Sequence, residues 1–104
     1  MSKYGSRKTF VDGMLFDSKA EAARWQELQL LERAGEVSGI ERQVTYELIP
    51  KQPGERAVKY IADFRYKTKE GQTIVEDVKG FKTEVYKIKR KLMLHVHGIR
   101  VVEV

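Results

Sequence analysis

The chain reads Tyr60-Ile-Ala-Asp63-Phe64 and, after a turn at Gly71, Ile74-Val-Glu-Asp77-Val-Lys79-Gly80. Both segments are rich in the β-branched and aromatic residues that favour strands. Because alternate residues of a strand share a face, Asp77 and Lys79 emerge side by side while Glu76 points the other way. Asp63, on the neighbouring strand, lies within reach of them. Two carboxylates and an ammonium in this arrangement predict a site for a hard divalent cation beside a phosphate group.

The rest of the sequence predicts a small α+β domain around this pair of strands. Asp12-Gly13 favours a tight hairpin turn, Ser18 is a good helix N-cap, and Gly35 and Gly98 are typical helix ends. The expected order is a hairpin at 9–16, a helix at 18–34, strands at 42–49, 58–67 and 73–79, a helix at 83–97 and a strand at 99–104. We therefore expect one domain over residues 1–104, with a mixed central sheet.

The first predicted helix carries two acids with different alternatives. Ser18 and Glu21 match a capping box, so Glu21 has a structural role open to it besides a place in an acidic cluster. Glu27 is the rival: at 100° per residue it falls on the apolar arc, where a buried carboxylate needs a partner or a metal. That arc is formed by Ala20, Ala23, Leu28, Leu31 and Ala34.

Composition limits the classes of function. The 104 residues include no cysteine, which excludes disulfides, thiolate zinc sites and cysteine nucleophiles. No apolar run approaches the roughly 18 residues that span a bilayer, and residues 1–8 have no apolar signal region behind them. A cytoplasmic protein is therefore expected.

The net charge of +5 is unevenly placed. Residues 1–52 carry eight basic and eight acidic side chains, whereas residues 53–104 carry twelve basic and seven acidic ones. Five cations follow the acid-x-lysine run and predict contacts with the phosphates of a polyanion, although a solvated helix face is the alternative. They are Lys82, Lys87, Lys89, Arg90 and Lys91.

Other side chains near these elements carry weaker signals. Gln43, opening the strand at 42–49, has an amide that suits a metal-bound water or a phosphate, or simply a strand end. Tyr86 is expected to pack on the sheet, with stacking on an unpaired base as the alternative. His95 and His97 share no helix face, which argues against a histidine metal site. The second helix is expected to bury the stripe formed by Val85, Ile88, Leu92 and Val96.

The order helix, three strands, helix, strand, with an acid on the second strand and acid-x-lysine on the third, resembles the PD-(D/E)XK nuclease superfamily. That resemblance implies a restriction-endonuclease-like core. More narrowly, three stretches look like a family of small phage and prophage endonucleases similar to Holliday junction resolvases. They are Phe-Asp-Ser-Lys-Ala-Glu at 16–21, Tyr-Ile-Ala-Asp-Phe at 60–64 and Glu-Asp-Val-Lys-Gly-Phe-Lys-Thr at 76–83.

Carried over to this chain, the resemblance implies that Asp63 and Asp77 bind Mg²⁺, with Mn²⁺ as a substitute. Glu21 would complete the acidic cluster, and Lys79 would be the motif lysine. Two positions depart from the family pattern: Ala62 stands in place of the proline, and the second acid is aspartate rather than glutamate. Both departures affect geometry and leave the metal ligands in place.

The expected function is that of a divalent-metal-dependent endonuclease that hydrolyses phosphodiester bonds in DNA. The resemblance further implies branched DNA as substrate, a homodimer, and a role in phage recombination or replication in the host bacterial cytoplasm. No membrane and no small-molecule cofactor are expected. The alternatives are a nonspecific or partner-directed nuclease, and a nucleic-acid-binding module that does not cleave.

Overall fold

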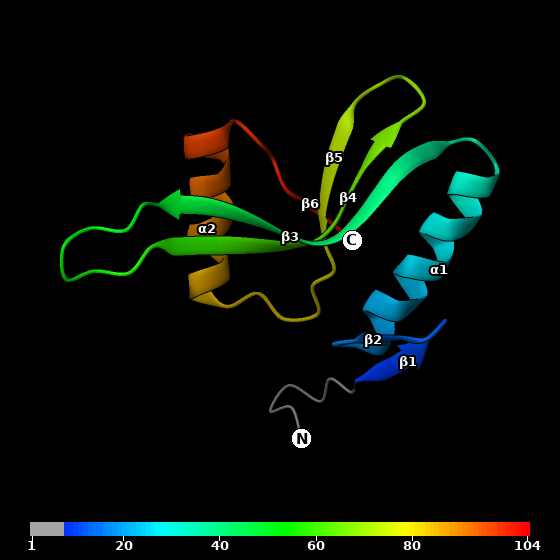
Figure 1. The fold of residues 1–104 in the computed structure, drawn as a ribbon, viewed down its shortest axis with the longest axis horizontal. Coiled ribbons are helices and arrows are strands. Elements are labelled where there is room, and N and C mark those ends of the chain that lie inside the picture. Colours follow the sequence, from blue (N-terminus) through cyan, green and yellow to red (C-terminus); the bar gives the residue numbers. More distant parts are fainter. Residues whose placement is uncertain (1–7) are drawn as a thin grey trace.

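The computed structural model describes residues 8–104 of the chain, and the expectations for residues 1–7 lie outside the described residues. The described part is a mixed α+β fold (Figure 1). The predicted order of hairpin, helix, three strands, helix and strand is confirmed. The elements are β1 (Thr9–Val11), β2 (Met14–Phe16), α1 (Lys19–Arg33), β3 (Val37–Ile49), β4 (Val58–Thr68), β5 (Thr73–Asp77), α2 (Glu84–His97) and β6 (Val102–Glu103).

The main sheet has four strands in the order β3-β4-β5-β6. The first three strands are antiparallel neighbours, and β6 pairs in parallel with β5, so the sheet is mixed as predicted. A parallel neighbour requires a crossover connection, and α2 supplies it. Strands β1 and β2 form a separate hairpin, in which Asp12 and Gly13 have the positive φ angles of 52° and 76° that a tight turn needs.

Side chains cap the start of both helices. The Ser18 hydroxyl accepts the backbone N–H of Glu21 at 3.0 Å, and the Thr83 hydroxyl accepts that of Tyr86 at 3.0 Å. Gly98, at a φ of 68°, ends α2 in the left-handed conformation that glycine adopts without strain. Local capping chemistry therefore explains why the helices begin and end within a residue or two of their predicted limits.

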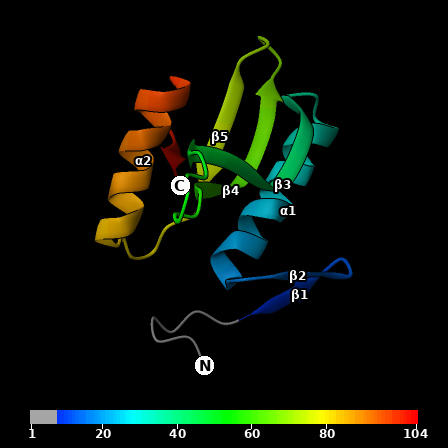
Figure 2. The same cartoon turned by 60° about the vertical axis from the view of Figure 1, so that its left-hand side comes forward.

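The two helices lie on opposite sides of the central strands (Figures 1 and 2). One buried cluster packs against α2 and includes Tyr60, Ala62 and Val75, while a second packs against α1 and includes Phe16 and Phe64. Strand β4 passes from the first cluster to the second between residues 62 and 64. Asp63 therefore lies at the junction of the two clusters.

Several boundary and packing expectations are wrong, and β6 covers only Val102–Glu103 rather than residues 99–104. Strand β3 begins at Val37 rather than at residue 42, because a register shift accommodates Gly39, which is in the left-handed conformation. Strand β5 ends at Asp77, so Lys79 follows the strand instead of belonging to it. The apolar arc predicted for α1 is mostly wrong: Leu28 is buried, but the three alanines of that arc are exposed.

The stripe predicted for α2 is mostly wrong, because only Leu92 of its four residues packs against the core. Val85, Ile88 and Val96 are exposed, and the helix buries Tyr86 and Met93 instead. Hydrogen bonding of a buried polar group explains why α2 buries Tyr86. The Tyr86 hydroxyl donates to Glu103, so this large ring is buried with its polar group satisfied.

Glu76 is buried on the α1 side of β5 and holds α1 to the sheet. Its carboxylate accepts two hydrogen bonds from Arg24, at 2.9 Å from Nε and 2.6 Å from Nη2, and another from the Tyr66 hydroxyl. The bidentate geometry is the one that arginine favours with carboxylates. Because Arg24 must reach Glu76, α1 turns the side bearing Glu21 and Leu28 toward the sheet.

Replacing Arg24 by methionine leaves a buried carboxylate without its counter-charge. We expect Arg24→Met to lower the free energy of unfolding by about 3–5 kcal/mol in urea denaturation. The double variant Arg24→Met/Glu76→Met should lose less stability than Arg24→Met, because it removes both charges. The control Arg33→Met, on the exposed side of α1, should lower the free energy of unfolding by less than about 1 kcal/mol. A double variant less stable than Arg24→Met alone would contradict this role.

Candidate functional site

Asp77 is the last residue of β5 and points to the α2 side, opposite to Glu76. It is only 2% exposed. Its Oδ2 accepts a hydrogen bond from the Tyr60 hydroxyl at 2.5 Å, and its Oδ1 lies 3.3 Å from Lys79 Nζ. Oδ1 makes no hydrogen bond with the described residues. One oxygen of this buried carboxylate is thus fixed by tyrosine, while the other has only a nearby cation.

Asp63 approaches Asp77 from the neighbouring strand. Its Oδ2 accepts the backbone N–H of Val78 at 2.7 Å, which ties the side chain to the residue that directly follows Asp77. A carboxylate held by a backbone N–H has a defined position. The structure therefore brings together the two acids that the sequence places on adjacent strands.

Glu21 joins these acids from the first turn of α1. It is 4% exposed, and its Oε1 has no hydrogen-bond partner among the described residues. Its backbone N–H serves the Ser18 cap, while its carboxylate lies close enough to Asp63 to affect the titration of that group. The rival Glu27 has a side chain 64% exposed and lies 4.0 Å from Arg24 Nη1. Glu21, not Glu27, is the helical acid beside Asp63.

The electrostatics of Asp63 reflect this crowding. Burial raises the pKa of Asp63 from 3.8 to about 8, repulsion from Asp77 and Glu21 adds to the rise, and the Val78 N–H opposes it. Like charges in a partly desolvated space disfavour ionisation until a cation offsets them. Perturbed acids of this kind are concentrated at functional sites.

The cluster fits a hard divalent cation in its chemistry. All three side chains offer carboxylate oxygens, and two of those oxygens, Glu21 Oε1 and Asp77 Oδ1, are buried without a hydrogen bond. Across residues 8–104, however, no three acids or histidines are gathered tightly enough to form a metal site as they stand. Binding an ion would therefore require the acidic side chains to move closer together.

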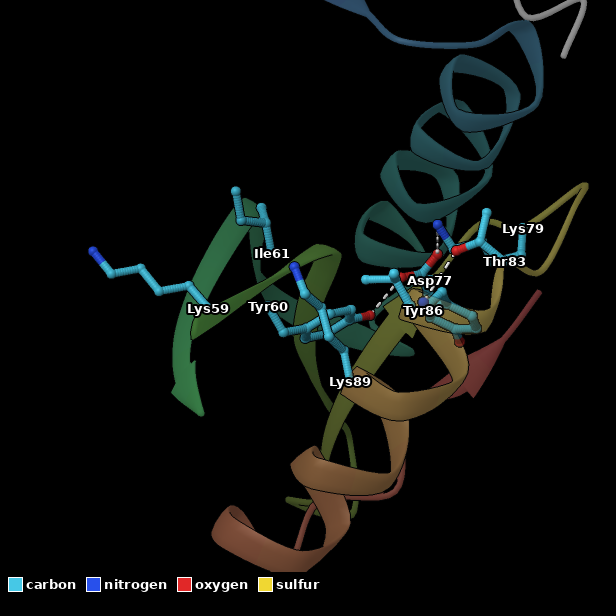
Figure 3. A pocket seen from close by; sticks show the side chains of 9 residues that line it. Lys59, Tyr60, Ile61, Asp77, Lys79, Thr83, Tyr86 and Lys89 are labelled. Carbon is cyan, nitrogen blue, oxygen red and sulfur yellow. Dashed lines mark hydrogen bonds and ion pairs between the residues drawn. The ribbon is translucent and has the colours of Figure 1, made fainter. Parts of the chain in front are cut away.

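A hollow of about 310 Å³ opens beside Asp77, between β4 and the start of α2 (Figure 3). Lys79 lies at the same end of it, with its Nζ 4.7 Å from the centroid of the Tyr86 ring. Lys89 lies along the hollow, and Lys59 lies at the far end. Three lysines against one aspartate give the hollow a positive character.

Of the other residues predicted to contact phosphates, three form ion pairs with nearby acids. Lys82 and Arg90 form ion pairs with Glu103 at 3.1 and 3.0 Å, and Lys87 pairs with Glu84 at 3.3 Å. The Lys87–Glu84 pair is exposed, so it contributes little energy and exchanges readily for a phosphate. The two pairs with Glu103 belong to a partly buried network, because Glu103 also accepts the Tyr86 hydroxyl. Lys91 is exposed.

Gln43 also lies near the acids. The pairs Arg42 with Phe64 and Val44 with Ala62 place Gln43 opposite Asp63 on the β3–β4 ladder. It is exposed and has a positive φ of 53°, which is uncommon for a residue other than glycine. Such backbone strain is often found at functional sites.

Sequence reasoning missed Tyr60 and Lys59. The sequence gives no indication that Tyr60, three residues before Asp63, contacts Asp77, because that contact depends on the tertiary arrangement of β4 and β5. Tyr86 is buried, so its ring packs on the sheet as expected and offers no open face for stacking. His97 contacts the Glu47 carbonyl oxygen at 2.7 Å, which gives it a role at the edge of the sheet.

A family model described as "Protein of unknown function (DUF1064)" matches residues 1–101, which include all three clustered acids and Lys79. No curated protein and no solved structure matches the chain. In the described part of the chain, no helix has both the length and the apolar composition to cross a membrane.

Because the pKa of Asp63 is higher in the folded protein, folding favours its protonated form. Without metal, this contribution to stability should be fully present below pH 3.8 and be lost as the pH rises through about 8. Asp63→Asn keeps an acceptor for Val78 but cannot ionise. We expect its free energy of unfolding to exceed that of the wild type by about 1–2 kcal/mol at alkaline pH, measured by urea denaturation in chelator. Equal pH profiles for the two proteins would contradict the raised pKa.

Proposed function

We propose that this chain, which belongs to the DUF1064 family, is a divalent-metal-dependent endonuclease that hydrolyses phosphodiester bonds in DNA. The observation that carries the proposal is the meeting of Glu21, Asp63 and Asp77, from three different elements, beside Lys79. Acids so placed are costly to stability, which is understandable if they serve a function. The resemblance to the PD-(D/E)XK nucleases assigns these residues the same chemistry.

Glu21, Asp63 and Asp77 would hold the cation, which is Mg²⁺ or Mn²⁺. A bound ion of this kind lowers the pKa of water and offsets charge on a phosphate oxygen. The unbonded oxygens of Glu21 and Asp77 are the ones available to it. The second oxygen of Asp77 stays fixed by the Tyr60 hydroxyl, which limits how far the carboxylate rotates.

Lys79 contributes the positive charge of the site itself. Its ammonium group is held between the Asp77 carboxylate and the face of the Tyr86 ring. If the acids held a cation, Lys79 would be available to meet the developing negative charge on a phosphate, a role in which a positioned cation is worth most. Gln43, opposite Asp63 on the ladder, would orient a water or a phosphate at the edge of the cluster.

DNA is the proposed substrate because its phosphates match the positive hollow next to the acids. Lys89 and Lys59 extend the positive charge away from Asp77 along that hollow. Such contacts supply affinity and position but little sequence readout. Branched DNA, a homodimer and action in the cytoplasm of a phage-infected bacterium are the further proposals that the family resemblance supports.

The proposal is tested by incubating labelled DNA with the protein in Mg²⁺, in Mn²⁺ and in chelator. We expect cleavage that requires metal, and a loss of rate of at least about 100-fold in Asp77→Asn and in Glu21→Gln. Glu27→Gln is the matched control, because it changes an exposed carboxylate of the same helix, and it should cleave at the wild-type rate.

Two results would overturn this assignment. Cleavage that survives both chelation and Asp77→Asn would exclude a metal mechanism at this site. Binding without cleavage in any tested metal would instead support a nucleic-acid-binding module.

A further inference from the structure

The hollow beside Asp77 is lined by two chemically different kinds of side chain. Lys79 lies at the end that holds Asp77, while Lys59 lies at the far end with Lys89 between them (Figure 3). The apolar side chains Ile61 and Val85 also line it. They are 52% and 62% exposed, although both belong to regular elements. A ligand that carries anionic and apolar groups together therefore suits the hollow.

The floor of the hollow explains where such a ligand makes contact. Tyr60 and Tyr86 are 4% and 5% exposed, and their hydroxyls are bound to Asp77 and Glu103. The two rings are closed to stacking. The exposed apolar surface that remains comes from Ile61 on β4 and Val85 on α2, which face the same space from two elements.

Paired DNA does not offer a match for that apolar surface. In a duplex the base faces are stacked on one another, and a protein that follows the backbone meets phosphate and sugar. Only an unpaired or extruded nucleotide presents an apolar base together with its phosphates. A volume of about 310 Å³ lies at the small end of ligand pockets, and suits a single nucleotide rather than a longer segment.

We infer that this hollow receives one unpaired nucleotide of the DNA strand that is cut, with the base against Ile61 and Val85 and its phosphate near Lys89. The inference rests on the proposed nuclease function and narrows its substrate class. The preferred DNA contains unpaired nucleotides beside the cut, as bubbles and single-stranded flaps do. Opening a fully paired duplex costs a few kcal/mol, so paired DNA is the weaker substrate.

Two DNAs of equal length and charge test the inference: a fully paired duplex, and the same duplex with a bubble of three mismatches. Binding is measured by fluorescence anisotropy in chelator, so that no cleavage occurs. We expect the wild type to bind the bubble about tenfold more tightly, a difference of roughly 1.4 kcal/mol. Val85→Ser and Lys89→Ala should bring the ratio of the two affinities close to one.

Matched variants on the same helix serve as controls. Val96→Ser alters an exposed valine outside the hollow and should leave both affinities unchanged. Lys91→Ala removes an exposed cation outside the hollow. It should weaken the binding of both DNAs by the same factor, as the loss of a phosphate contact does. Equal wild-type affinity for the two DNAs would overturn the inference, as would a loss of preference in Val96→Ser equal to that in Val85→Ser.

The same two DNAs, now with Mg²⁺, separate this inference from the proposed function. If both DNAs are cleaved at equal rates in a metal-dependent way and bind with equal affinities, the proposed nuclease function stands and the inference about the hollow is overturned. If the wild type prefers the bubble, Val85→Ser abolishes that preference and no metal supports cleavage, the inference about the hollow stands and the proposed nuclease function is overturned. A change only in the oligomeric mass of Val85→Ser would show that the apolar residues contact another protein copy, which also overturns the inference.

Discussion

Two adjacent carboxylates, Glu76 and Asp77, are buried on one short strand, and the rest of the structure is arranged around them. Strand alternation sends them to opposite sides of the sheet, so a single partner cannot serve both. Glu76 takes the guanidinium of Arg24 from α1, whereas Asp77 takes the Tyr60 hydroxyl and the nearby ammonium of Lys79. A buried charge without a partner is strongly destabilising, so this dipeptide limits where the elements on both sides of it can pack.

The functional proposal follows from what this arrangement leaves incomplete. Glu76 is fully paired, but Asp77 keeps one oxygen without a hydrogen bond, and Asp63 and Glu21 add two more acids to the same small space. The two acids at Asp63 and Asp77 come from adjacent strands and the third from a helix, so the tertiary fold determines their meeting. A cation would relieve their repulsion, and the lysines of the neighbouring hollow extend the site toward an anionic polymer.

The parts of this fold that could be predicted are the ones governed by local chemistry. Alternation predicted that Asp77 and Glu76 diverge, and the Ser18 cap predicted the start of α1. The predictions that were wrong concern features that depend on contacts between residues distant in sequence. Neither helical wheel could show that α1 turns to bring Arg24 to Glu76, or that α2 buries Tyr86 because Glu103 satisfies its hydroxyl. For the same reason the sequence does not distinguish Glu21 from Glu27, whose difference in burial depends on how α1 packs against the sheet.

The most direct test of the account is whether metal binding at the acidic cluster expels a proton. Calorimetric titration of Mn²⁺ at neutral pH, in two buffers of different ionisation enthalpy, reports both binding and the protons released. Because burial and neighbouring acids keep Asp63 protonated, we predict saturable binding with release of about one proton. Asp63→Asn should abolish that release. Absence of binding, or the same binding and proton release in Asp63→Asn, would contradict the account.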